Sequence, residues 1–211
     1  MTIRPAPIEH DPALERPLVC GPDSGPDPTL FPVRLEGWVS RGFGRGSKDL
    51  GCPTANLPDE SISPYYDTLS TGVYFGFARV LHSSPDSNED EDDKVHPMVM
   101  SIGWNPFYQN ETRTAEVHIL HSYPSDFYGK ELRVIMLGFI RPEYNYSSMD
   151  ALIKDIETDK QVALKSTTER ETYRKYEKDE FFFKETSLEP AKEDLTKPRV
   201  KPDQEASAEG K

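Results

Sequence analysis

Residues 112–121, TRTAEVHILH, alternate between two faces in the way that a β-strand does. One face would be mainly apolar and the other mainly polar: Ala115, Val117, Ile119 and His121 against Thr114, Glu116, His118 and Leu120. Glu116 is therefore a carboxylate within an otherwise hydrophobic strand. Such a carboxylate costs free energy unless it is paired, solvated or used chemically, so Glu116 is a candidate general base. The alternative is a carboxylate on a solvent-facing edge of a sheet.

Four other stretches have the β-branched, aromatic or alternating residues of strands. They are 33–40 (VRLEGWVS), 72–81 (GVYFGFARVL), 97–104 (PMVMSIGW) and 131–140 (ELRVIMLGFI). Gly76, in the middle of the second stretch, predicts a bulge or a place where a ligand or another backbone comes close. Since the links between these stretches do not look helical, the pattern favours an antiparallel barrel, closed or partly open, over a doubly wound sheet.

Helices are predicted only after the strands. Ser147 can cap a helix, with Asp150 three residues later, and apolar residues follow at helical spacing to about position 163. A second helical pattern covers residues 169–183. Its aromatic end, residues 181–183, is expected to dock on the barrel. The predicted architecture is thus mainly β with helical cover.

Residues 41–56, RGFGRGSKDLGCPTAN, bring together glycines, a lysine and small polar side chains. Glycines let successive N–H groups form an anion-binding concavity, and Lys48 adds a charge suited to phosphate. Thr54 and Asn56 would face one side of an extended segment, where their oxygens could hold a hard cation such as Mg²⁺. Walker A and Rossmann patterns both fail here, at Lys48 and Ser47 respectively. The alternative is a glycine-rich loop with incidental charges.

The overall composition narrows the class of protein. The 211 residues carry a formal net charge of −12, which argues against a nucleic-acid binder because such proteins normally present a basic face. Two cysteines are too few for a disulfide framework and predict a reduced, cytoplasmic setting. No stretch resembles a signal peptide or an integral membrane segment.

The chain is expected to divide into three parts. Residues 1–30 are rich in Pro, Asp and Gly, which predicts a mobile N-terminal arm. Residues 31–183 hold the barrel and its C-terminal helices, with an acidic loop inserted at 83–94. Residues 184–211 have no aromatic residue and little apolar content, which predicts a disordered tail. A monomer is expected, because no exposed apolar repeat suggests an interface.

Several motifs in this order resemble the riboflavin kinase (flavokinase) family of eukaryotic, monofunctional type. They span roughly residues 34–163 and comprise RGFGRGSKDLGCPTAN, STGVYFGFA, MSIGWNPFY, EVHILH, DFYGKEL and GFIRPE. The resemblance implies a six-stranded antiparallel Greek-key barrel with a C-terminal helix. It also implies transfer of the ATP γ-phosphoryl to the ribityl 5′-hydroxyl of riboflavin, giving FMN and ADP. The chain is expected to make no FAD.

The resemblance also implies roles for particular residues. Glu116 would be the catalytic base, and Thr54 and Asn56 would hold Mg²⁺, with Zn²⁺ or Mn²⁺ as alternative ions. Arg141 and Tyr146 would belong to a flap over the flavin. The nucleotide would contact seven residues: Gly42, Gly44, Gly46, Lys48, Thr54, His121 and Tyr128. Two alternatives remain, a non-catalytic flavin- or nucleotide-binding barrel and an oligonucleotide-binding barrel, and the acidic balance disfavours the second.

Overall fold

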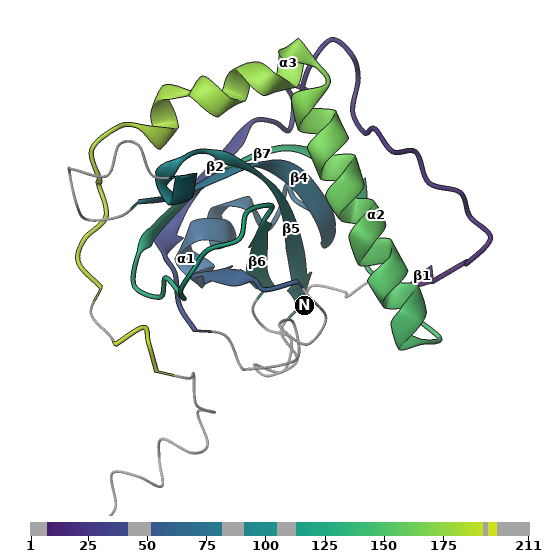
Figure 1. The fold of residues 1–211 in the computed structure, drawn as a ribbon, viewed down its shortest axis with the longest axis horizontal. Coiled ribbons are helices and arrows are strands. Elements are labelled where there is room, and N and C mark those ends of the chain that lie inside the picture. Colours follow the sequence, from purple (N-terminus) through teal and green to yellow (C-terminus); the bar gives the residue numbers. More distant parts are fainter. Residues whose placement is uncertain (1–7, 42–51, 82–90, 105–112, 192–193, 198–211) are drawn as a thin grey trace, which may run out of the picture.

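Six antiparallel strands curl into a barrel-like sheet, and helices cover part of its outer face (Figure 1). The computed structural model describes residues 8–41, 52–81, 91–104, 113–191 and 194–197. The strands of the sheet are β2 (Val33–Trp38), β3 (Ala55–Leu57), β4 (Gly72–Leu81), β5 (His96–Trp104), β6 (Arg113–Ile119) and β7 (Glu131–Arg141). A separate pair joins β1 (Ile8–Glu9) to β8 (Tyr144–Asn145). The helical elements are α1 (Asp59–Ile62), η1 (Ser63–Tyr65), η2 (Glu91–Asp93), α2 (Met149–Thr168), α3 (Glu171–Arg174), η4 (Lys175–Lys178) and η5 (Glu180–Phe182).

The strand order is β2-β7-β4-β5-β6-β3. Strands β4, β5 and β6 are consecutive neighbours, and β7 returns to lie beside β4, which is the Greek-key arrangement. The edge strands β2 and β3 approach each other where the Ser40 amide donates to the Asn56 carbonyl at 3.1 Å. The predicted mainly β, six-stranded antiparallel Greek-key barrel is confirmed. The sixth strand, β3, begins within the last two residues of the glycine-rich stretch 41–56.

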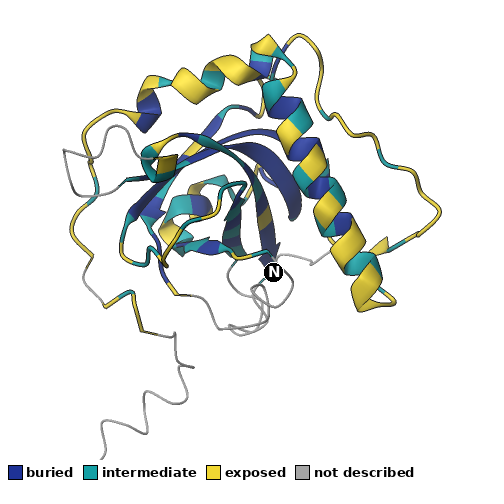
Figure 2. Ribbon diagram, viewed as in Figure 1, coloured by how far each residue is buried: buried dark blue, intermediate teal, exposed yellow. Residues whose placement is uncertain are grey.

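Two hydrophobic cores lie on opposite sides of the sheet (Figure 2). Alternate residues of β4 and β7 point into the barrel, as Tyr74 and Val134 do, or outward to the helices, as Phe75 and Ile135 do. Both strands are therefore buried on both faces, which explains why they are the most continuously apolar stretches of the sequence. Phe182, which is fully buried, docks the end of the helical segment on the outer core as expected.

Gly76 lies at a shift of register between β4 and β7. A Cβ at this position would come within 1.9 Å of the Ile135 carbonyl oxygen, so no larger residue fits without a backbone shift. The bulge and the close backbone approach predicted at Gly76 are both confirmed.

The helices differ in detail from the prediction. Ser148 rather than Ser147 caps α2, since the Ser148 side chain accepts a hydrogen bond from the Ala151 amide at 3.2 Å. The helical pattern over 169–183 forms three short segments, α3, η4 and η5, instead of one helix.

Among the described residues, no helix combines the length and the apolar character needed to cross a bilayer.

The described parts of both terminal extensions contact the domain, while the mobility of the arm and the disorder of the tail stay predictions. In the arm, the Cys20 amide donates to Ser166 Oγ at 2.9 Å. In the tail, Trp38 Nε1 donates to the Glu189 carbonyl at 2.8 Å. These contacts use backbone groups and a few polar side chains, which composition does not reveal. Only residues 91–94 of the acidic insertion are described, and the first three of them form the short helix η2.

Candidate active site

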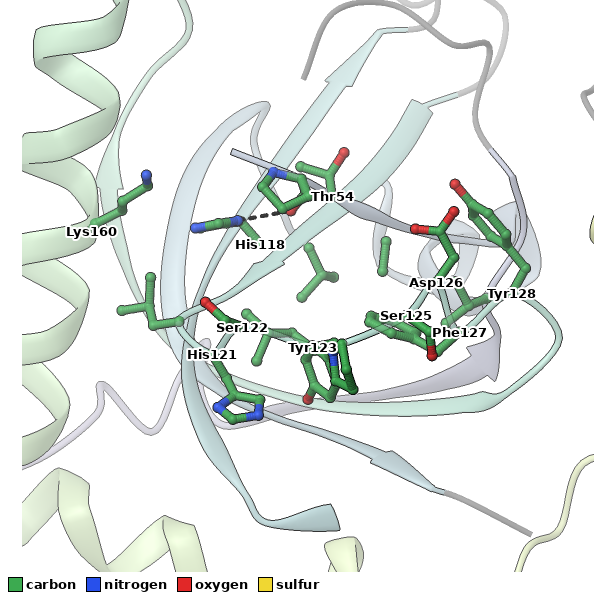
Figure 3. A pocket seen from close by; sticks show the side chains of 17 residues that line it. Thr54, His118, His121, Ser122, Tyr123, Ser125, Asp126, Phe127, Tyr128 and Lys160 are labelled. Carbon is green, nitrogen blue, oxygen red and sulfur yellow. Dashed lines mark hydrogen bonds between the residues drawn. The ribbon is translucent and has the colours of Figure 1, made fainter. Parts of the chain in front are cut away.

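A pocket of about 850 Å³ opens beside β3, β6 and the segment that follows β6 (Figure 3). Its lining comes from four parts of the chain: Val39, residues 53–55, residues 117–128 and Lys160. Thr54, His121 and Tyr128, which the sequence predicted to be nucleotide-binding, all belong to this lining. Gly42, Gly44, Gly46 and Lys48 lie outside the described residues.

Thr54, Asn56 and Glu116 lie close together beside the pocket, although only Thr54 is part of its lining. Their roles as a metal pair and a base stay predictions. Strands β3 and β6 are antiparallel, and their register places Asn56 directly opposite Glu116. Thr54 immediately precedes β3, and its hydroxyl donates to Glu116 Oε2 at 3.2 Å. Glu116 lies on the half-exposed polar face of β6, while its neighbours Ala115 and Val117 are buried. The hydroxyl, amide and carboxylate oxygens fit the preference of a hard divalent cation.

His118 ties the segment before β3 to β6. Its Nδ1 lies 2.8 Å from the Pro53 carbonyl oxygen. Because a carbonyl can only accept a hydrogen bond, Nδ1 is the nitrogen that carries the proton. Burial lowers the pKa of His118 and so favours the neutral ring, although the Pro53 carbonyl opposes that shift. His118 thus helps to fix the position of Thr54 beside Glu116.

The other end of the pocket is aromatic. The ring of Tyr123 meets His121 edge-on at 4.8 Å and packs against Phe127 at 4.6 Å. His121 stacks on His96 with ring centroids 4.1 Å apart, and its Nε2 lies 2.7 Å from Asp92 Oδ1. Aromatic faces bind flat heterocycles well, so this end suits a nucleobase. The sequence analysis did not indicate Tyr123 and Phe127, because an aromatic residue that lines a pocket cannot be distinguished in the sequence from one that packs in a core.

Lys160 is the other residue that the sequence did not indicate. It reaches the pocket from α2, and its ammonium lies 2.7 Å from Glu157 Oε1. It is the sole lysine or arginine in the part of the pocket lining that the structure describes. Helix α2 carries many charged residues, and in the sequence Lys160 cannot be distinguished from a lysine that faces solvent. Only the packing of α2 against the sheet reveals which face points at the site.

Arg141 and Tyr146 do not line this pocket. Arg141 is 7 % exposed and donates to Asp159, with Nη2 2.8 Å from Oδ2. The Tyr146 hydroxyl donates to Asp155 Oδ2 at 2.8 Å. Both residues thus belong to a buried polar cluster between β7, β8 and α2. Their contact with a flavin stays a prediction.

A family model described as "Riboflavin kinase" matches residues 29–167. The chain belongs to the riboflavin kinase family, which phosphorylates riboflavin to FMN.

Relatives support this membership. The riboflavin kinase of Pyricularia oryzae is 54 % identical over 157 residues, covering 72 % of this chain and 78 % of the relative. That of Aspergillus terreus is 44 % identical over 184 residues, covering 78 % and 87 %. The crystal structure of riboflavin kinase from Trypanosoma brucei is similar with a TM-score of 0.57 at 24 % identity, covering 75 % of this chain and 93 % of that one. The structural likeness supports the fold.

Proposed function

We propose that this chain transfers the γ-phosphoryl group of ATP to the ribityl 5′-hydroxyl of riboflavin, giving FMN and ADP. The observation that carries this proposal is that Thr54, which lines a pocket with an aromatic end, donates a hydrogen bond to Glu116, the residue opposite Asn56 in the sheet. In this reaction the hydroxyl oxygen forms a bond to the γ-phosphorus, and the bond from that phosphorus to the β,γ-bridging oxygen breaks. Family membership gives the two substrates.

Glu116 is the base that takes the proton from the ribityl hydroxyl. Its half-exposed position on β6 lets it reach a substrate, and the hydrogen bond from Thr54 orients it. Thr54 and Asn56 would hold Mg²⁺, with Zn²⁺ or Mn²⁺ as alternatives, because their neutral oxygens suit a hard cation. Such an ion would neutralise charge on the transferred phosphoryl group.

The nucleotide would lie along the pocket, with its base at the aromatic end beside His121 and Tyr128. Lys160 would meet its phosphates, because phosphoryl transfer depends mainly on positioning and on stabilisation of negative charge. The four residues of the glycine loop, Arg141 and Tyr146 keep the roles that the family resemblance implies. The monomeric state and the cytoplasmic location also stay predictions from the sequence.

The test is to incubate the purified protein with riboflavin, ATP and Mg²⁺, with and without EDTA, and to separate the flavins by chromatography. We expect FMN to appear only when the metal is available. If riboflavin bound but stayed unphosphorylated, the chain would be a flavin-binding barrel without the chemistry. If it neither bound nor reacted, the assignment of the substrate would be wrong.

A further inference from the structure

The arm that precedes the barrel is bound along α2. Strand β1 pairs in parallel with β8, and the His10 amide donates to the Asn145 carbonyl at 3.0 Å. Further along, Arg170 Nη1 donates to the Gly21 carbonyl at 2.8 Å. Figure 1 shows the arm running from β1, near the start of α2, to the junction of α2 with α3. The family model begins at residue 29, so the arm lies outside the part of the chain that this model matches.

Arg16 is the central contact of the arm. Its guanidinium lies 3.1 Å from Asp155 Oδ1 through Nη1 and also pairs with Asp159 through Nη2. The side chains of Arg16, Asp155 and Asp159 are 11 %, 10 % and 2 % exposed. This is therefore a largely buried ion cluster, in which charges interact more strongly than at the surface.

The same two carboxylates hold Arg141 and Tyr146. Asp159 accepts from Arg141 Nε and Nη2, at 3.0 and 2.8 Å to Oδ2, while Asp155 accepts from the Tyr146 hydroxyl at 2.8 Å. Asp155 and Asp159 are one turn apart on α2, so the helix presents both to the end of β7 and to β8. Arg16 thus shares its partners with the two residues predicted to bind the flavin.

The charges of the cluster balance only with the arm in place. Two carboxylates, Asp155 and Asp159, face two guanidiniums, those of Arg16 and Arg141, with His10 Nε2 3.6 Å from Asp155. Burial alone would raise the pKa of Asp155, but the Tyr146 hydrogen bond and the charges of Arg16 and Arg141 hold it below its usual value. Without Arg16 the two buried carboxylates would share one guanidinium, that of Arg141, which lies 2.8 Å from Asp159 and 3.9 Å from Asp155, and the excess buried negative charge is costly. The cluster would then relax by moving the groups that bind the carboxylates.

We propose that Arg16 is a positioning residue for the flavin side of the site: by completing the Asp155–Asp159 ion cluster, it fixes Arg141 and Tyr146 in place. This inference rests on the proposed function, because it takes riboflavin as the ligand near residues 141–146. Arg16 itself touches no substrate.

The test compares Arg16→Met with the unchanged protein. Riboflavin affinity is measured without ATP, by quenching of flavin fluorescence, and the KM values for riboflavin and ATP are measured separately. We expect riboflavin binding to weaken about 2- to 30-fold, the range for residues that act through others, while the KM for ATP changes less than about twofold. Arg16→Lys keeps the charge but not the fork that spans both carboxylates, so its riboflavin affinity is expected to lie between those of Arg16→Met and the unchanged protein.

A second variant tests the charge balance. Adding Asp155→Asn to Arg16→Met removes the excess negative charge but leaves an oxygen that can accept from Tyr146, so riboflavin affinity is expected to recover. Arg34→Met, which removes the exposed Arg34–Asp179 pair on another face, is the matched control and is expected to leave every constant unchanged.

Three outcomes would overturn the role of Arg16: unchanged riboflavin affinity in Arg16→Met, an equal rise in both KM values, or no recovery in the double variant. Circular dichroism identifies variants that have not folded, and the Lys variant and the double variant then decide. Failure of the proposed function is a separate result, since it would appear as absence of FMN from the unchanged protein. If that protein bound no riboflavin at all, both proposals would fall.

Discussion

At the scale of single residues, the site depends on small polar groups whose neighbours are fixed by the sheet. The strand register places Asn56 opposite Glu116, and the Thr54 hydroxyl completes the group. The alternation of β6 predicted that Glu116 points away from the barrel interior, and the burial of Ala115 and Val117 confirms it. Which residues stand opposite Glu116 could not be predicted from periodicity, because register depends on the partner strand.

Thr54→Ala is expected to reduce turnover at least as much as Glu116→Gln. The first change removes a proposed metal ligand and the second removes the base, whose loss costs about 10²- to 10⁴-fold in kcat. The measurement is steady-state FMN formation at limiting and saturating Mg²⁺. Near-native turnover of Thr54→Ala at limiting Mg²⁺ would contradict the metal assignment.

His96 is expected to make the protein less stable in mild acid. Burial is the largest cause that lowers the pKa of His96 below its ordinary value of 6.5, and the neighbouring His121 adds to it, while the Glu91 carbonyl opposes it. The unfolded chain therefore takes up a proton at a higher pH than the folded one. This contribution to the free energy of unfolding is fully present above pH 6.5 and declines as the pH falls toward the lowered pKa.

Urea unfolding at pH 7.5 and 5.5 measures this effect. His96→Gln cannot take up the proton, so its free energy of unfolding should fall less between the two pH values than that of the unchanged protein. Equal losses would show that other groups govern the acid sensitivity.

At the scale of elements, α2 connects the main parts of the molecule. It packs on β4 and β5, directs Lys160 toward the pocket and presents Asp155 and Asp159 to the arm. The helical spacing after Ser147 predicted that a helix would form here, and the structure places its cap one residue later. Helical spacing does not reveal which neighbour each face meets, so neither the role of Lys160 nor the ion cluster could be predicted.

Lys160→Met is expected to raise the KM for ATP by about 10- to 150-fold, because a hydrogen bond to a charged group contributes about 1.5–3 kcal/mol. Lys154→Met, at an exposed position of the same helix, is the matched control and should leave the KM unchanged. Steady-state kinetics with each substrate varied in turn provide the measurement. An unchanged KM for ATP in Lys160→Met would place the phosphates elsewhere.

At the scale of the whole molecule, the described structure is held together by two hydrophobic cores and by the attached arm. No group of three or more His, Cys, Asp or Glu side chains within the described ranges is arranged to hold a metal ion. The metal proposed at Thr54 and Asn56 would act on the phosphates of the nucleotide, so it would serve the reaction rather than the fold. We therefore expect removal of the metal to stop the reaction without lowering the stability of the fold.

Removal of divalent metal with EDTA is expected to abolish FMN formation without lowering the Tm. Thermal unfolding followed by circular dichroism, with and without EDTA, measures the second part. Readdition of Mg²⁺ should restore turnover. A drop of the Tm by several degrees in EDTA would instead indicate a metal that stabilises the fold.

The sequence alone determined five of the six strands of the barrel, the approximate place of the main helix and the family, because periods of 2 and 3.6 residues and a run of ordered motifs are local properties. Only the tertiary structure decided which distant residues meet. Thr54 reaches Glu116 across 62 positions, and Arg16 reaches Asp159 across 143. The arm looked unattached because its contacts are scattered polar groups rather than an apolar face. Such contacts exist only after the sheet and α2 have packed, so no local pattern records them.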